Sequence, residues 1–89
     1  MDYLPLLGEF LGSWLLVLSI LATGNYIVIG FTLALVIFLL SKTSGGHVNP
    51  AVTLAFFLKG SLSTAELVGY LVAQMLGGAV SFYTYKVLA

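Results

Sequence analysis

The 89-residue sequence contains no cysteine and no arginine, and it carries little charge of either sign. The absence of cysteine excludes disulfide scaffolds, thiol catalysis and cysteine-based zinc sites. Three lysines against three acidic residues leave no net charge, so the chain lacks the basic surface that binds nucleic acid. The lone histidine, His47, has no second histidine or cysteine with which to share a metal ion. We therefore expect no cofactor and no metal. Because no nucleophile–base pair is visible, we also expect no enzymatic activity.

Apolar residues dominate what remains. Hydrophobic residues make up 61% of the chain and charged residues only 7%, and the mean hydropathy is +1.15. A soluble domain of this length would need many more charged side chains to cover its surface. The composition therefore predicts a multi-pass integral membrane protein in contact with the lipid bilayer. A cleaved signal peptide fits less well, because such a segment begins with basic residues and ends after a short apolar core. Here the chain begins MDYLP, and the apolar stretch continues to Ala22.

Three segments are apolar enough for transmembrane helices, since a bilayer core of about 30 Å needs about 20 helical residues. We expect these helices at about residues 4–22, 26–41 and 64–88. A short turn at residues 23–25 makes the second helix antiparallel to the first. Ser61 or Ser63 is the expected N-cap of the third helix. Glu66 in the first turn of that helix complements the helix dipole.

Between the second and third segments, the polar sequence SGGHVNPAVT (residues 44–53) interrupts the apolar chain. Asn49 is a favoured N-cap and Pro50 suits the first helical position, so a helix is predicted over residues 50–59. Its apolar part spans about 12 Å, which is too short to cross a bilayer. Because no charge occurs in it before Lys59, we interpret it as a half-helix that enters and leaves the membrane on one side. An interfacial helix would carry a charged face.

The loop at residues 43–49 precedes this half-helix. Irregular backbone survives at membrane depth only where it is buried in protein or lines water, so we expect the loop to line a cavity or pore. Gly45 and Gly46 permit positive-φ backbone without side chains that block the lumen. Asn49 would cap the half-helix with its oxygen and turn its amide NH₂ to the lumen, at the positive end of the helix dipole. Such a site favours neutral polar solutes over cations. The alternative is a surface loop that caps an ordinary helix.

The motif SGGHVNPAVT resembles the first pore loop of the aquaporin, or major intrinsic protein, family. GEFLGSWLLVLS is similar to the family's first helix and YLVAQMLGGAV to its third, so the resemblance extends over nearly the whole chain. It implies an all-α integral membrane fold, one aquaporin-like half with three transmembrane helices and one re-entrant half-helix. It also implies a channel for water or small neutral solutes such as glycerol. The resemblance further implies a second repeat that is inserted in the opposite direction, and complete pores that assemble as tetramers.

The resemblance also assigns roles to individual residues. The pore-lining and selectivity positions that it implies are Asn49, Pro50, Ala51, Gly45, Gly46, His47, Val48 and Ile29. Ile29 matches one wall of the outer constriction, which is usually aromatic in strict water channels. Glu9 matches an acid that braces the pore loop, and we expect it near His47. Gln74 has two open interpretations, a buried brace of the loop or a polar contact between helices.

The sequence contains one such repeat. Val52 stands where the family's second repeat carries an arginine after Asn-Pro-Ala. Half a pore cannot conduct, so we expect a second aquaporin-like repeat from a longer chain, from a separate chain or from an inverted copy of this one. We favour the first, in which this chain is a fragment. The alternative function is a non-conducting membrane interaction protein that associates with full-length channels. Lys42 and Lys59 place the N-terminus in the cytoplasm by the positive-inside rule.

Overall fold

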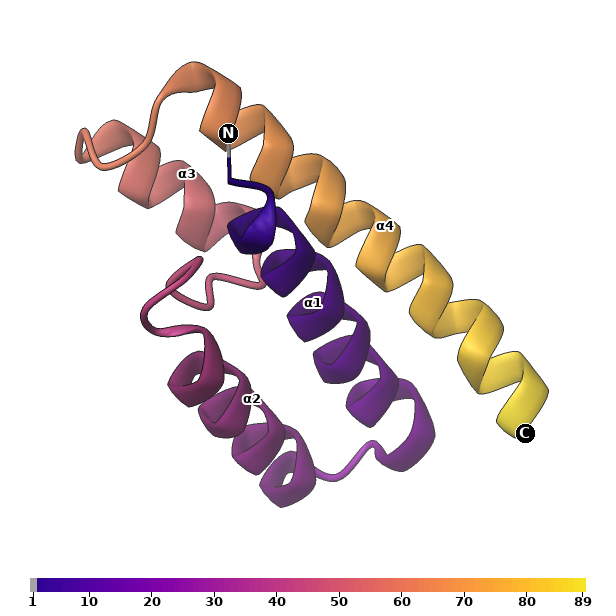
Figure 1. Cartoon of the computed structure of the whole chain (residues 1–89). Helices are drawn as coiled ribbons and strands as arrows, with labels where there is room; N and C mark the ends of the chain where they lie inside the picture. Colours follow the sequence, from indigo (N-terminus) through magenta and orange to yellow (C-terminus); the bar gives the residue numbers. More distant parts are fainter. Residues whose placement is uncertain (1) are drawn as a thin grey trace.

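The computed structural model describes residues 2–89, which form four α-helices and no strand (Figure 1). The helices are α1 Leu4–Thr23, α2 Tyr26–Leu40, α3 Pro50–Leu58 and α4 Thr64–Leu88. By length and composition, α1 and α4 are long and apolar enough to cross a membrane, whereas α2 is apolar but shorter, at 15 residues. The prediction of an all-helical chain is therefore confirmed.

Local residues explain the tight turn between α1 and α2. α1 continues one residue beyond the expected end, to Thr23, and stops at Gly24, which adopts left-handed backbone with a φ of 57°. Asn25 then caps α2, because its Oδ1 accepts the N–H groups of Ile27 at 2.9 Å and of Val28 at 3.2 Å. The chain thus reverses within two residues, and α2 returns antiparallel beside α1 (Figure 1).

The ends of α2 and α3 each fall one residue before the expected position. α2 ends at Leu40 because its carbonyl accepts the N–H groups of Thr43 and Gly45, which close a turn in place of another helical residue. α3 ends at Leu58, and the chain leaves the helix through Gly60 with a φ of +93°. That left-handed backbone favours glycine, and it turns the chain toward the start of α4.

Of the two serines expected as the N-cap of α4, Ser63 is the one the structure uses. The Ser63 hydroxyl accepts the Glu66 N–H at 3.1 Å, and the Glu66 carboxylate accepts the Ser63 N–H at 2.8 Å. This reciprocal capping box satisfies N–H groups that otherwise lack partners at a helix start. It fixes the position at which the longest helix begins.

α1 is the central helix, and it packs against both α2 and α4. A Cβ atom added at Gly77 of α4 would lie only 2.5 Å from the carbonyl oxygen of Phe10, so the two backbones touch at this crossing. Nearer the C-terminus of α4, the Trp14 indole N–H of α1 donates to the Thr84 hydroxyl at 3.0 Å. Close approach through glycine and a polar link between helices are both typical of packing in lipid.

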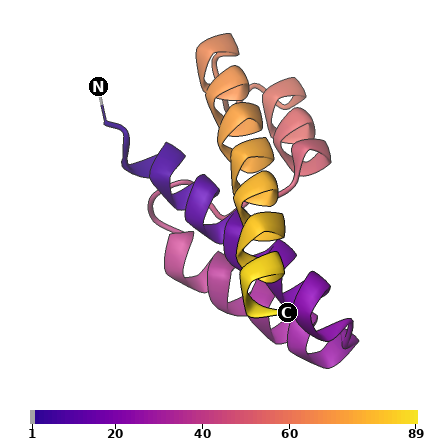
Figure 2. The same ribbon diagram turned by 90° about the vertical axis from the view of Figure 1, so that its right-hand side faces the viewer.

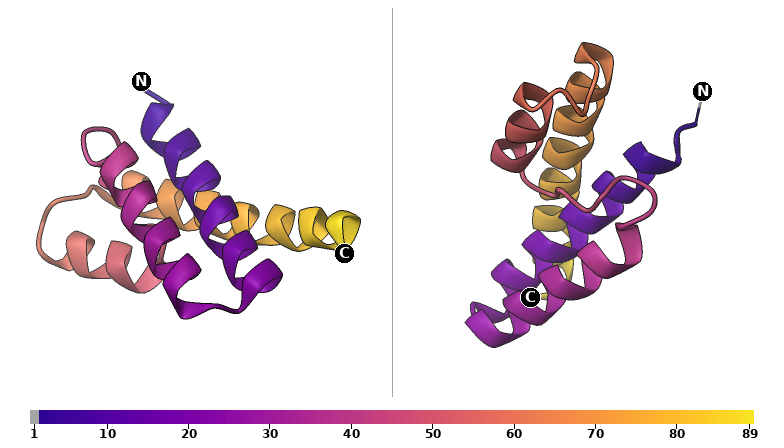
Figure 3. Two further views of the ribbon diagram at one scale, coloured as in Figure 1. Left: turned by 90° about the horizontal axis from the view of Figure 1, so that it is seen from below. Right: turned by 90° about the vertical axis from the view of Figure 1, so that its left-hand side faces the viewer.

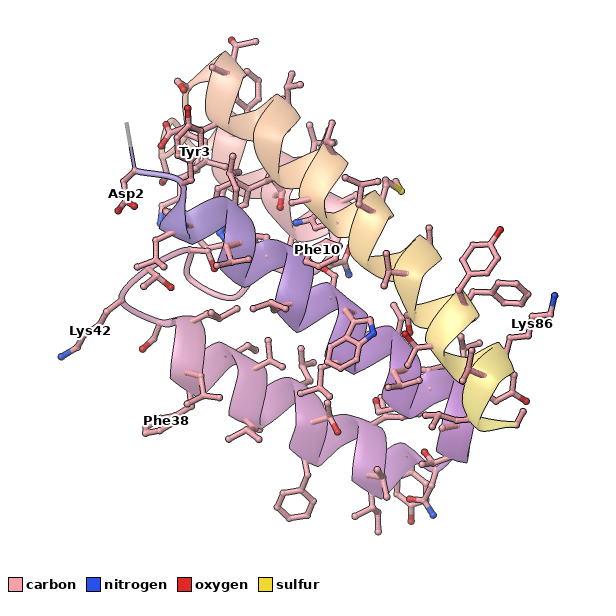
Figure 4. The ribbon with its side chains drawn as sticks, turned by 45° about the vertical axis from the view of Figure 1, so that its right-hand side comes forward. Asp2, Tyr3, Phe10, Phe38, Lys42 and Lys86 are labelled. Atoms are coloured by element: carbon pink, nitrogen blue, oxygen red, sulfur yellow. The ribbon has the colours of Figure 1, made fainter. Side chains whose placement is uncertain are left out.

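The short helix α3 lies beside the first half of α4, while α2 lies beside α1 (Figure 2). The connection over residues 41–49 passes across α1 before α3 begins (Figure 3). Lys42 and Asp2 lie at one end of the molecule, and Lys86 lies at the other, near the C-terminus (Figure 4). The fold therefore brings an irregular segment against the two longest helices.

Candidate functional site

The carboxylate of Glu9 holds the irregular segment in place. Glu9 lies on α1 with no exposed surface. Its Oε2 accepts the backbone N–H of His47 at 3.0 Å, and its Oε1 accepts that of Val48 at 2.8 Å. Burial of a carboxylate is costly unless several donors satisfy it, and two consecutive peptide groups supply such donors here. Glu9 therefore fixes both the position and the orientation of this stretch.

These two hydrogen bonds also orient two carbonyl groups. In a planar trans peptide, the N–H of one residue points opposite to the C=O of the residue before it. With the N–H groups of His47 and Val48 directed at Glu9, the carbonyls of Gly46 and His47 point away from it. Within residues 2–89, neither carbonyl accepts a hydrogen bond. The loop thus presents two free acceptors on the side opposite α1.

Gln74 of α4 links the carboxylate to α3. Its amide Nε2 donates to Glu9 Oε1 at 2.9 Å and to the hydroxyl of Thr53 at 2.7 Å. The Thr53 hydroxyl also contacts His47 Nδ1 at 3.0 Å. Thr53 has no exposed surface, and Gln74 is only 5% exposed. One connected polar network therefore joins α1, the loop, α3 and α4.

Aromatic side chains fix the imidazole of His47. The Phe56 ring stacks on it with centroids 4.6 Å apart and 16° between the planes, and the Tyr70 ring lies at 5.0 Å. The Tyr70 hydroxyl donates to the carbonyl of Ser44 at 2.8 Å, which attaches the start of the loop to α4. The ring of His47 therefore has little room to turn.

The backbone path of the loop needs special residues at three positions. Gly45 and Gly46 have φ values of 90° and 70°, a left-handed region that favours glycine. A Cβ atom added at Gly46 would also lie 2.8 Å from the Cα atom of Ile37 on α2. Val48 has a φ of 43°, which is strained for a β-branched residue. Its bond to Glu9 compensates for that strain.

The loop ends at the exposed tip of α3. Asn49 Oδ1 accepts the N–H of Ala51 at 2.8 Å, and Pro50 occupies the first helical position. Asn49 and Ala51 are exposed, so the positive end of the α3 dipole is open at the surface of this chain. A cavity of about 360 Å³ lies beside the tip; its lining consists of Ser13, Val17, Val48, Pro50, Gln74, Met75, Gly78 and Ala79.

The structure brings most of the sequence-predicted site residues together, but not all of them. Glu9, Gln74 and His47 share the polar network, and the tip of α3 follows directly. Ile29 does not join them, because it lies half-buried on α2, a helix that packs against α1 and not against α3 or α4. Among residues 2–89, no group of three histidine, cysteine or acidic side chains could hold a metal ion.

Three residues of the site were missed by sequence reasoning: Thr53, Tyr70 and Ser44. Two of them carried a usable signal. Thr53 is the only polar residue within α3, one turn after Asn49, and Tyr70 lies one turn before Gln74 on the same face of α4. The role of Ser44 depends on its carbonyl, and its side chain gives no signal for that role.

An apolar helical chain whose irregular segment is held by a buried carboxylate is typical of helical membrane proteins, in which loop backbone must be satisfied internally. Comparisons with known proteins give the family. The family model "Major intrinsic protein" matches residues 5–88. The chain therefore belongs to the major intrinsic protein family, whose members are membrane channels for water and small solutes and not enzymes.

Individual relatives agree with this assignment. The chain is 40% identical over 84 residues to the lens fiber major intrinsic protein of Gallus gallus. This match covers 81% of the present chain and 32% of the Gallus gallus protein. It is 36% identical over 89 residues to the glycerol uptake facilitator protein-like 6 of Lactiplantibacillus plantarum, a match that covers 90% of this chain and 41% of the relative. It is 45% identical over 60 residues to aquaporin-8 of Rattus norvegicus, a match that covers 67% of this chain and 23% of the relative. The chain thus spans well under half the length of these relatives. No solved structure matches it significantly.

Proposed function

We propose that this chain forms one half of a transmembrane pore through which water and small neutral solutes such as glycerol diffuse passively. In this proposal α1, α2 and α4 cross the bilayer, and residues 43–58 form a re-entrant loop and half-helix. The N-terminus lies in the cytoplasm, because Lys42 and Lys59 then follow the positive-inside rule. The proposal rests on the family membership and on the arrangement of the loop.

The observation that carries the proposal is the pair of free carbonyls at Gly46 and His47. Glu9 turns them away from α1, and carbonyl oxygens can accept hydrogen bonds from water or from solute hydroxyl groups. Directly beyond them, the exposed Asn49 stands at the positive end of α3. A row of acceptors that ends at a positive dipole suits a neutral polar solute and disfavours a cation.

A complete pore needs a second repeat. We propose that an inverted aquaporin-like repeat supplies it, within one longer chain, from a separate chain or from an inverted copy of this chain. The tip of the second half-helix would then meet Asn49, Pro50 and Ala51 at the centre of the pore. Complete pores would assemble as tetramers. With Ile29 and Val52 in the outer constriction, a pore of two identical copies would be wide and apolar there, and it would discriminate poorly among small neutral solutes.

Solute flux into proteoliposomes tests this proposal. Asn49→Asp keeps a good N-cap but puts a negative charge at the tip of α3, so we expect loss of the water or glycerol flux of the wild type. Asn25→Asp is the matched control, because Asn25 caps α2 in the same way and lies outside the loop. Equal flux above empty liposomes from both variants would contradict a pore at Asn49. A folded wild-type chain with no flux above empty liposomes would favour either a fragment of a longer channel or an interaction protein that associates with full-length channels.

A further inference from the structure

The imidazole of His47 uses only one of its two ring nitrogens inside the chain. Nδ1 contacts the Thr53 hydroxyl at 3.0 Å. Nε2 forms no hydrogen bond with residues 2–89, and it is not among the buried polar atoms of these residues that lack a partner. A side chain at position 45 would cover it, since a Cβ atom added at Gly45 would lie 3.5 Å from Nε2. With glycine there, the Nε2 edge of the ring stays open.

The Gln74 amide fixes the direction of the hydrogen bonds behind this ring. Gln74 Nε2 lies 2.9 Å from a carboxylate oxygen of Glu9. If the amide were turned over, two acceptor oxygens would face each other at that distance, which would be repulsive. The amide nitrogen therefore also faces Thr53, at 2.7 Å, and an amide nitrogen can only donate. Thr53 consequently accepts from Gln74.

The Thr53 hydroxyl then determines the protonation of the ring. Its oxygen already accepts from Gln74, and its single hydrogen needs an acceptor in a residue with no exposed surface. His47 Nδ1 is that acceptor if it carries no proton. If Nδ1 carried the proton, the Thr53 oxygen would accept hydrogen bonds from both Gln74 and His47. The buried hydroxyl hydrogen of Thr53 could then no longer donate to Nδ1, and a lost buried hydrogen bond is costly. The neutral ring must therefore carry its proton on Nε2.

We propose that His47 is held as the Nε2–H tautomer and serves as a hydrogen-bond donor to hydroxyl-bearing solutes at the mouth of the pore. Gln74 and Thr53 are positioning residues, which act on the solute only through the ring. The loop would then offer a side-chain donor beside the free carbonyl acceptors of Gly46 and His47. A hydroxyl group both donates and accepts, so it matches this pair. This role as a donor rests on the proposed function, whereas the tautomer does not.

Nitrogen NMR on ¹⁵N-histidine-labelled chain in lipid bilayers tests the tautomer directly. His47 is the only histidine, so the spectrum has a single source. At mildly alkaline pH, where imidazole is neutral, we expect a protonated Nε2 and an unprotonated Nδ1. Thr53→Val removes the donor to Nδ1 and should lower the ratio of Nε2–H to Nδ1–H by about fivefold, the factor that one hydrogen bond contributes. Thr53→Ser keeps a hydroxyl and should retain the wild-type ratio.

The second measurement tests whether Nε2–H contacts water, and it uses magnetisation transfer from water to the labelled ring. We expect transfer to His47 Nε2–H and much less to the indole N–H of Trp14, the only tryptophan, which donates to Thr84. A wild-type ring protonated on Nδ1, or a ring without water transfer, would overturn the inference. The wild-type spectrum alone decides the tautomer, so a valine variant that does not fold leaves the test intact. Neither result depends on flux, which tests the proposed function separately.

Discussion

At the scale of single residues, the carboxylate of Glu9 replaces the regular hydrogen bonds that the loop lacks. It accepts two backbone N–H groups of the loop and one amide N–H of α4, all within 3.0 Å. An ionisable side chain inside an apolar protein is costly, so Glu9 marks a position where several donors must be gathered at one point. The polar network of this chain is built around that point.

Replacement of Glu9 by glutamine tests the importance of the charge. The amide in Glu9→Gln has one acceptor oxygen in place of two, so at least one buried donor loses its partner. We expect the free energy of unfolding to fall by about 2–3 kcal/mol, measured by detergent denaturation in mixed micelles. Glu66→Gln is the control, because glutamine also fits a capping box. Equal stability of wild type and Glu9→Gln would contradict bracing by the charge.

At the scale of helices, most boundaries could be predicted from local signals. Asn25, Asn49 and Ser63 all cap the helices that follow them, because capping depends on neighbours in the sequence. The long-range contacts were harder to predict. Glu9 and His47 are 38 residues apart, and the resemblance to a family pointed to their proximity where spacing alone could not. The positive φ of Val48 and the contact of Gly46 with Ile37 left no signal, because both depend on tertiary packing.

Two adjacent glycines of α4 provide a test of the crossing between α1 and α4. Gly77→Ala would place a methyl group 2.5 Å from the Phe10 carbonyl oxygen, whereas nothing lies within 4 Å of a Cβ atom added at Gly78. We expect Gly77→Ala to lower the free energy of unfolding by about 1–3 kcal/mol through overpacking. Gly78→Ala should leave it unchanged or raise it by up to about 1 kcal/mol. Indistinguishable variants in the same denaturation assay would contradict the close crossing.

At the scale of the whole molecule, the proposed topology puts both ends of the segment between α2 and α4 on one side of the membrane. The chain contains no cysteine, so single cysteines can be introduced without background labelling. We expect Lys42→Cys and Lys59→Cys to react with an impermeant thiol reagent from the same side, and Asn25→Cys from the other. Labelling of Lys42→Cys and Lys59→Cys from opposite sides would mean that residues 43–58 cross the bilayer.

The attachment of one short loop to three helices has a consequence for its motion. Glu9 of α1, Tyr70 of α4 and the tight contact of Gly46 with Ile37 of α2 hold the loop from three directions. A segment held in this way can open only when the helices separate. In hydrogen–deuterium exchange, the amides of His47 and Val48 should therefore exchange as slowly as those in the middle of α1. The passage that this loop borders would then behave as a fixed aperture rather than as a gate.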